Sequence, residues 1–313
     1  MKVHAFDGLP RIGRAVITMG VFDGVHLGHR HLIEATRHAA EATRAASVAI
    51  VFTPHPDEVI RPGTIVARLL PPEVVLERLA SAGADHALPV RFDDDVRGLT
   101  PEAFLDGLAP ALDLQAVVMT PDSAFGRGRS GTMARVSEIG AGRGFHAVPV
   151  TPASVDGEVV SSSRIRGALA SGAIGDAAGL LGAAPLLRGT VIHGDARGRE
   201  LGFPTANLAF DYHPALPALG IYLGRATVTT RGVGPGHPAL VSVGVRPTFH
   251  DRGSVLVEVY LLDWDGDLYD ATLDVELVHR LRAERRFDST DALVVQMRQD
   301  EAEARRLIGL DGG

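Results

Sequence analysis

The first half of the sequence alternates short apolar runs with longer segments in which apolar residues recur every three or four positions. Residues 47–52 have the length and composition of a buried strand, whereas residues 28–45, rich in Ala and Ile, follow a helical pattern. Strands that alternate with helices form parallel sheets, so we predict a parallel sheet wrapped by helices. The same pattern predicts further strands at 15–19, 116–119 and 146–150 and helices at 73–82, 101–108 and 164–170.

Strand patterns dominate the second half, and they predict a small antiparallel β-barrel followed by a helix. Trp264-Asp265-Gly266-Asp267 is typical of a hairpin turn. Residues 178–185 are mostly small and predict a flexible joint between two domains, 1–183 and 184–313. The predicted strands are 187–193, 220–230, 239–245, 255–262 and 273–279, and the helix is 290–308.

Composition narrows the class of protein. The chain has 313 residues, more than the ~250–300 that one core usually holds. A net charge of -7 argues against a strongly basic nucleic-acid binder, and the absence of cysteine excludes disulfides and thiolate chemistry. No apolar run reaches the ~18–20 residues of a membrane helix, and no signal peptide is evident. We predict a cytoplasmic protein with no membrane partner; its oligomeric state stays open.

The loop Gly20-Val21-Phe22-Asp23-Gly24-Val25-His26-Leu27-Gly28-His29 joins the first long strand to its helix. Ligands of parallel sheets bind at this end of the strands, beside helix N-termini. Glycines allow close backbone approach, and His26 and His29 share one helix face. Packing, capping or metal binding by the two histidines are alternatives. Within such a turn, however, the pair favours phosphoryl or nucleotidyl transfer.

A second anion-binding candidate is Ser161-Ser162-Ser163-Arg164-Ile165-Arg166. Hydroxyl groups at a helix start either cap the helix or contact an anion there. The two arginines would supply fixed positive charge for phosphate oxygens. By itself the motif is more typical of a helix cap.

Two candidates stand out in the second half. Gly194, Gly198 and Gly202 bracket a loop that leads to Pro204-Thr205-Ala206-Asn207. On an extended segment Thr205 and Asn207 point to one side, and their oxygens suit Mg²⁺. A turn-forming Asn in a Gly/Pro loop is the alternative. Glu258 lies in a nearly apolar strand, either on a solvated face or as a general base.

These motifs together resemble the bacterial bifunctional riboflavin kinase/FAD synthetase family. The Gly20–His29 loop is similar to the family's HxGH signature of nucleotidyltransferases, and Pro54-His55-Pro56 matches its PHP element. Residues 186–310 resemble the riboflavin kinase module. The matches there include the Gly-rich loop, Pro204 to Asn207, Gly220-Ile221-Tyr222, Ser242-Val243-Gly244, Pro247-Thr248-Phe249, Glu258, Asp267-Leu268-Tyr269 and residues 281–287.

The resemblance implies a nucleotidyltransferase-type, Rossmann-like α/β domain at 1–183 and a riboflavin kinase barrel at 184–313. It implies ATP-dependent phosphorylation of riboflavin to FMN, then adenylylation of FMN to FAD and pyrophosphate, with Mg²⁺ as cofactor. Glu258, His29, His26 and Arg166 would be catalytic, and Thr205 and Asn207 would hold the metal. The implied ATP-binding residues are Gly20, Phe22, Asp23, Gly24, His26, Gly28, His29, Ser162, Ser163, Arg166, Gly194, Gly198, Gly202, Pro204 and Thr205; the implied flavin-binding residues are Pro54, His55, Pro56, Asp122, Phe125, Arg282 and Phe287.

The sequence departs from the family pattern around the acceptor pocket of the first domain. Thr53 stands where the family usually has Asp, Leu70 where it has Thr, and Thr120 where it has Gly. Ser123 replaces an aromatic residue, which removes stacking area for a flavin. These departures keep an alternative open: a riboflavin kinase whose first domain is weak, non-catalytic, or specific for another phosphorylated acceptor.

Overall fold

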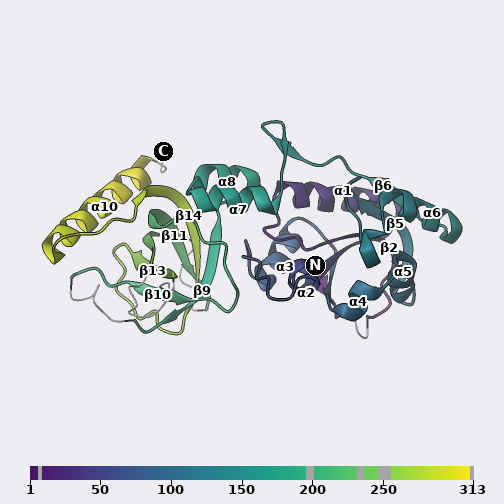
Figure 1. The fold of residues 1–313 in the computed structure, drawn as a ribbon, viewed down its shortest axis with the longest axis horizontal. Coiled ribbons are helices and arrows are strands. Elements are labelled where there is room, and N and C mark those ends of the chain that lie inside the picture. The colour runs from purple at the N-terminus through teal and green to yellow at the C-terminus, as the bar shows by residue number, and fades with distance from the viewer. Residues whose placement is uncertain (6–8, 195–200, 231–235, 246–254, 311–313) are drawn as a thin grey trace. The chain divides into compact units, whose positions relative to one another are not determined.

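The chain folds into two compact units in a computed structural model that describes residues 1–5, 9–194, 201–230, 236–245 and 255–310 (Figure 1). The first unit comprises Met1–Val66 and Pro72–Ser161. The second comprises Ala67–Pro71 and Ser162–Gly313.

The first unit is built on a parallel sheet, as predicted. Its six strands in the described residues follow the order β1-β4-β3-β2-β5-β6, and every neighbouring pair is parallel. The carboxyl ends of β3, β2 and β5 therefore lie side by side at one edge. The strands are β1 (Lys2–Val3), β2 (Gly13–Gly20), β3 (Ala46–Thr53), β4 (His86–Arg91), β5 (Leu112–Met119) and β6 (His146–Pro149).

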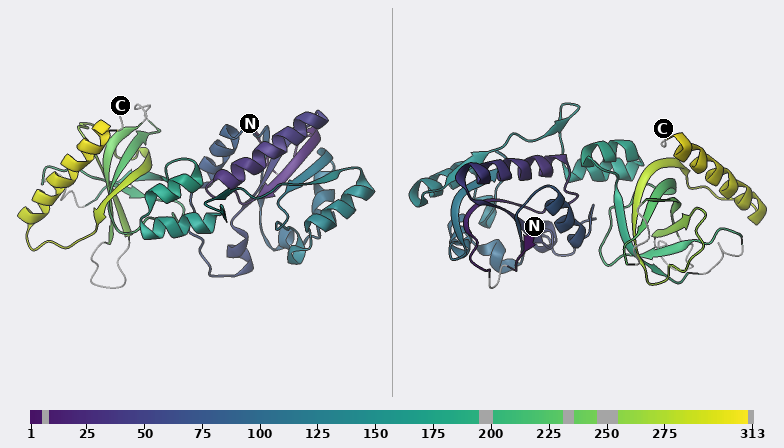
Figure 2. Two further views of the ribbon diagram at one scale, coloured as in Figure 1. Left: turned by 90° about the horizontal axis from the view of Figure 1, so that it is seen from above. Right: turned by 180° about the vertical axis from the view of Figure 1, so that it is seen from behind.

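Helices cover both faces of this sheet (Figure 2). One face packs on α5 (Pro101–Leu108) and α6 (Met133–Arg143), and Ile17 of β2 lies in that core. The other face carries α1 (Leu27–Thr43), which packs against β2, β3 and β5. The remaining elements are α2 (Pro56–Ile60), α3 (Pro72–Ser81), α4 (Asp94–Gly98), the 3₁₀ turn η1 (Arg127–Arg129), and the antiparallel pair β7 (Ser154–Val155) and β8 (Glu158–Val159).

The second unit contains a closed antiparallel barrel, also as predicted. The described strands follow the order β10-β13-β12-β11-β14-β9, and β9 pairs with β10 to close the ring. Tyr222, Val241 and Leu273 are among its fully buried side chains. The strands are β9 (Leu186–Ile192), β10 (Ala206–Ala209), β11 (Gly220–Val228), β12 (His237–Val245), β13 (Val255–Leu261) and β14 (Thr272–Ala283).

Three helices of the described chain accompany the barrel. The predicted C-terminal helix is α10 (Thr290–Leu310), whose Ala304 packs into a cluster with Leu223 and Leu240. The other two, α7 (Ser162–Ser171) and α8 (Ile174–Leu181), pack on each other, and α8 packs against β14.

Two local predictions are wrong. Residues 178–181, expected in a flexible joint, form the last turn of α8, where Leu180 and Leu181 are buried. The turn predicted at Trp264–Asp267 does not close a hairpin, because β13 pairs with β12 and β10 whereas β14 pairs with β11 and β9. This segment connects two strands that are not neighbours in the barrel.

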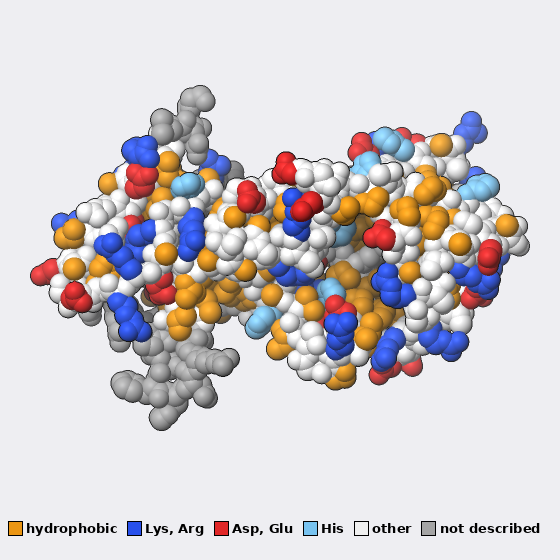
Figure 3. All heavy atoms as spheres, turned by 45° about the horizontal axis from the view of Figure 1, so that its top comes forward, with side chains coloured by type: hydrophobic (Ala, Val, Ile, Leu, Met, Phe, Trp, Pro, Cys, Tyr) orange, Lys and Arg blue, Asp and Glu red, His pale blue; other side chains and the backbone are white. Residues whose placement is uncertain are grey.

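The surface carries mixed charge. On the face drawn in Figure 3, acidic and basic side chains are interspersed rather than gathered into one basic band. Among the described residues, no helix combines the length and apolar character needed to cross a membrane.

Candidate functional sites

The loop between β2 and α1 is a tight turn that buries its own apolar residues. Phe22 and Val25 are fully buried although both have a positive φ, of 54° and 40°, and Gly24 has a φ of 87°. Left-handed backbone is costly for such side chains, so their burial must hold the turn in place. Asp23 is also buried, at 3% exposed. The predicted ATP-binding loop is therefore anchored by its own buried side chains.

His26 and His29 form a stacked pair at the start of α1. Their ring centroids are 3.7 Å apart with 17° between the planes, and Phe22 meets the His29 ring edge-on at 5.2 Å. Gly28 allows this packing, because a Cβ atom there would lie 3.1 Å from Cε1 of His26. The predicted shared face is confirmed as direct ring contact.

The pair also performs a structural task. His26 is the N-cap of α1, and its Nδ1 accepts a hydrogen bond of 3.4 Å from the backbone N–H of His29. Burial, and then the neighbouring His26, lower the pKa of His29 well below its usual value. His29 is therefore neutral at pH 7 and can offer a phosphate an N–H donor rather than a charge.

Pro54, His55 and Pro56 follow β3 directly, at the sheet edge that the β2–α1 loop shares. His55 is the N-cap of α2: its Nδ1 accepts from the N–H of Asp57 at 3.1 Å, and Glu58 completes the capping box. The Thr53–Pro54 peptide bond is cis. These three residues directly follow β3, as expected, but Nδ1 of His55 is already used as a hydrogen-bond acceptor for the backbone of α2.

Asp122 and Phe125 follow β5 at the same edge but have different surroundings. Asp122 is exposed, whereas the Phe125 ring is 8% exposed and packs against Phe104 with centroids 5.7 Å apart. Of the residues that depart from the family pattern, Thr120 and Ser123 pair with each other, their hydroxyl oxygens 2.5 Å apart. The loop thus presents polar groups where an aromatic ring was expected.

The helix α7 begins at Ser162, two residues before the predicted start at Arg164, so Ser162 and Ser163 lie in its first turn rather than ahead of it. The Arg166 Nε donates to the backbone carbonyl of Ala67 at 2.7 Å. These residues belong to the second compact unit, as does the buried Leu70. Their joint action with the histidine pair stays a prediction.

Three predicted kinase residues lie close together in the barrel. Thr205 directly precedes β10, Asn207 lies on β10, and Glu258 lies on the paired strand β13. The Thr205 hydroxyl donates to Oε1 of Glu258 at 3.3 Å, and Asn207 lies directly opposite Glu258 in the strand register. Asn207 is 8% exposed, and its amide lies against the backbone of Gly194. A hydroxyl, an amide and a carboxylate thus bring several oxygen atoms together at one place on the barrel wall.

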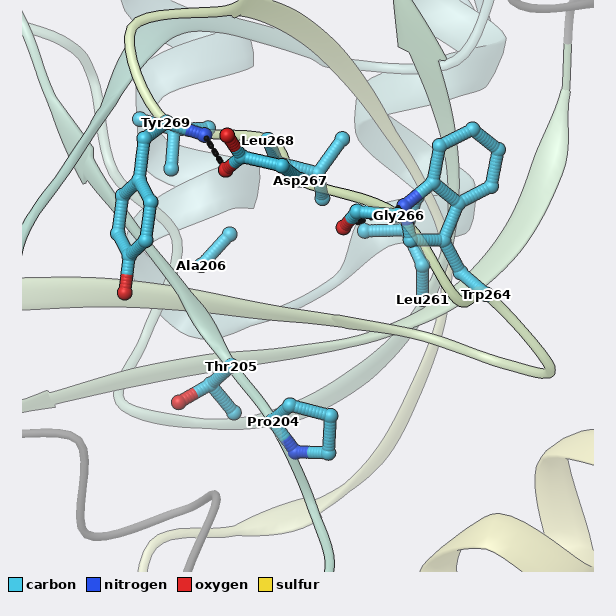
Figure 4. A pocket seen from close by; sticks show the side chains of 10 residues that line it. Pro204, Thr205, Ala206, Leu261, Trp264, Gly266, Asp267, Leu268 and Tyr269 are labelled. Carbon is cyan, nitrogen blue, oxygen red and sulfur yellow. Dashed lines mark hydrogen bonds between the residues drawn. The ribbon is translucent and has the colours of Figure 1, made fainter.

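A pocket lies beside Thr205, and apart from Pro204 and Thr205 its lining residues were not predicted to be ligands (Figure 4). Tyr269 stacks on His193 with centroids 3.8 Å apart, and the Asp267 carboxylate accepts from the N–H of Tyr269 at 3.0 Å. Strand pattern could not reveal this pocket, because its walls come from β9, β10 and the β13–β14 connection. The lining residues are Val191, Pro204, Thr205, Ala206, Leu261, Trp264, Gly266, Asp267, Leu268 and Tyr269.

The two residues predicted to bind flavin in the barrel unit contact each other. The guanidinium carbon of Arg282 lies 5.8 Å from the ring centroid of Phe287, as a cation–π contact. Arg282 also makes a bidentate ion pair with the nearly buried Asp300 of α10. Of the loop glycines, Gly202 has a φ of 85° and Gly198 lies outside the described residues.

Comparisons with known proteins agree with this division. A riboflavin kinase family model matches residues 181–308, and an FAD synthetase family model matches residues 10–164. The relative from Listeria monocytogenes named bifunctional riboflavin kinase/FMN adenylyltransferase is 34% identical, over 93% of this chain and 91% of its own. A relative of the same name from Escherichia coli K12 is 34% identical over 98% and 97%.

A solved structure shares the whole fold. It is described as a macrolide-efflux protein from Streptococcus pneumoniae and superimposes with a TM-score of 0.87 at 28% identity, covering 97% of this chain and 99% of its own.

Proposed function

The chain belongs to the family of bifunctional riboflavin kinase/FMN adenylyltransferases, and from that premise we propose which of its residues carry each reaction. The enzyme phosphorylates riboflavin with ATP to give FMN, and it adenylylates FMN with a second ATP to give FAD and pyrophosphate. We assign the kinase to the barrel and the adenylyltransferase to the parallel sheet.

In the kinase reaction, the terminal ribityl hydroxyl of riboflavin attacks the γ-phosphorus of ATP. The new O–P bond forms as the bond to ADP breaks, and Glu258 accepts the hydroxyl proton. The contact between Thr205 and Glu258 carries this assignment, because it brings the predicted base and a phosphate-side hydroxyl within 3.3 Å.

Mg²⁺ fits the same group of oxygen ligands. Thr205 and Asn207 would hold it, and when bound it would neutralise charge on the phosphates of ATP. Within the described residues no cluster of three or more His, Asp or Glu side chains could hold a metal alone. ATP oxygens completing the coordination shell would suit Mg²⁺, which is usually bound by few protein ligands.

The pocket beside Thr205 would take the adenine of ATP. Val191, Leu261 and Leu268 give it apolar walls, and the Tyr269 ring offers a stacking surface. An adenine held there places the phosphates toward Thr205, where the proposed chemistry occurs.

In the adenylyltransferase reaction, a phosphate oxygen of FMN attacks the α-phosphorus of ATP, and pyrophosphate leaves. His29 would donate an N–H to the α-phosphate, while His26 holds the start of α1 in place. Ser162, Ser163 and Arg166 would bind the leaving phosphates, and the loops after β3 and β5 would receive FMN. Cytoplasmic location stays our prediction.

The test separates flavins by chromatography after incubation with riboflavin, ATP and Mg²⁺. The parent should form FMN and FAD, Glu258→Gln should lose FMN formation by ~10²–10⁴-fold, and His29→Asn should lose only FAD formation, by ~10²–10³-fold. Glu276→Gln, on β14, the next strand along the chain, is the matched control. Formation of FMN alone by the parent would support the alternative of an inactive first domain.

A further inference from the structure

Two buried polar atoms of the first unit have no hydrogen-bond partner among the residues that the structure describes: the hydroxyl of Thr18 and Nδ1 of His29. Thr18 is fully buried on β2. Buried polar groups in folded proteins are nearly always satisfied, by protein atoms or by bound water. Both atoms therefore call for a physical explanation.

The two side chains face the same interface. Ala15 and Ile17 of β2 belong to the core shared with α5 and α6. Side chains alternate along a strand, so Thr18 points to the opposite face, which α1 covers. On α1, His29 lies one turn before Leu32 and Ile33, which that helix buries.

Their positions along the two elements also correspond. The tight turn sends α1 back over the strand from which it came, as in other strand–helix units. Thr18 lies two residues before the end of β2 at Gly20, and His29 lies two residues after the start of α1 at Leu27. Both residues are thus close in sequence to the turn that joins β2 to α1.

We propose that Thr18 is a positioning residue for the adenylyl transfer. One bound water would accept a hydrogen bond from the Thr18 hydroxyl and donate one to Nδ1 of His29. A neutral imidazole with Nδ1 as acceptor must carry its proton on Nε2, so the substrate phosphate meets a donor at that atom. The proposal rests on the role assigned to His29 above. It explains why a hydroxyl lies in an otherwise apolar stretch of β2.

The experiment compares Thr18→Val, which removes the hydroxyl at nearly constant shape, with Thr18→Ser, which keeps it. Thr36→Val is the matched control: Thr36 is 1% exposed on α1, but its hydroxyl donates to the carbonyl of Leu32 at 2.7 Å. FAD formation from supplied FMN is measured as kcat and KM over pH, and riboflavin phosphorylation serves as the internal reference. Nitrogen NMR of ¹⁵N-histidine-labelled protein reports the tautomer of His29.

Thr18→Val should lower kcat for FAD formation by about 10- to 100-fold, as for other groups that orient a histidine, with little change in KM for ATP. Thr18→Ser should restore most of the activity, and Thr36→Val should stay near the parent. The Nε2–H tautomer should dominate in the parent and lose population in Thr18→Val.

A parent-like kcat and tautomer in Thr18→Val would overturn the proposal, as would equal losses in Thr18→Val and Thr36→Val. If His29→Asn keeps full FAD formation, the role assigned to His29 is wrong, while the NMR measurement still decides whether Thr18 sets its tautomer.

Discussion

Replacing Gly194 with Ala should damage the kinase through the side chain of Asn207. An ideal Cβ atom at Gly194 would lie 2.0 Å from Nδ2 of Asn207, whereas ordinary contacts begin near 3.4 Å. The amide must therefore retreat by about 1.4 Å, the difference between these two distances. Gly194 lacks a positive φ, so alanine carries no backbone penalty there. The substitution acts as a probe of where Asn207 must be.

The size of the effect follows from this displacement. Misplacing a group that orients reactants by ~1 Å costs about 10²-fold in rate. We expect kcat/KM for riboflavin phosphorylation to fall by about 100-fold and the required Mg²⁺ concentration to rise. Moving one side-chain amide off its rotamer costs about 1 kcal/mol, so the protein should remain folded. FAD formation from supplied FMN should be unchanged.

The assay measures initial rates of FMN formation across a Mg²⁺ titration. Gly179→Ala is the control, because Gly179 lies in α8 with open space around the added Cβ. It should keep full activity and gain up to about 1 kcal/mol of stability. A second single variant, Asn207→Ala, shows whether the amide is needed at all. If Asn207→Ala is inactive but Gly194→Ala keeps the kinetics and the Mg²⁺ dependence of the parent, then the position of the Asn207 amide does not control the kinase.

Three further predictions test other parts of the molecule. Ser123→Phe should lower KM for FMN in FAD formation by about 5-fold, since stacking contributes ~1 kcal/mol; an unchanged or higher KM would show that the pocket is built differently. Folding lowers the pKa values of His29 and His86, so near pH 6.5 and below the unfolded chain binds more protons than the native state. The free energy of unfolding, and with it the urea midpoint, should therefore fall as the pH drops below about 6.5. His29→Asn should flatten this slope, and an identical slope would contradict it. A fragment of residues 162–313 should fold and phosphorylate riboflavin, whereas one of residues 186–313 should unfold at lower urea because it lacks α8; equal midpoints would disprove the contribution of that helix.

Local pattern predicted the elements well where the local signal and the packing agree. Strand β3 and helix α1 lie within two residues of their predicted bounds. A buried strand needs a continuous apolar run, and a helix that packs on a sheet needs one apolar face, so both leave a clear pattern in the sequence. Pairing between strands was not predictable in this way. The turn residues at Trp264 to Asp267 favour reversal of the chain, but the barrel sends the next strand to β11 and β9 instead.

The candidate site shows the same limit for side chains. Sequence spacing brought Thr205, Asn207 and Glu258 into consideration, and strand register places them together. Sequence spacing did not predict that His55 caps α2 or that Phe125 packs on Phe104, because helix caps and core rings use the same residue types as ligands do. The pocket beside Thr205 was missed because its walls come from segments far apart in the chain.

The domain boundary is the clearest case in which packing decides what composition cannot. Helices α7 and α8 lie largely between the two family matches, which end at 164 and begin at 181. Ala and Gly make this stretch look like a linker, yet Ile174 and Leu180 are buried. The Arg280 guanidinium of β14 donates to the carbonyl of Ser171 and would collide with a Cβ atom at Gly172. The proposed phosphate-binding motif at the start of α7 therefore belongs to the same compact unit as the barrel, although the chemistry proposed for it is that of the adenylyltransferase.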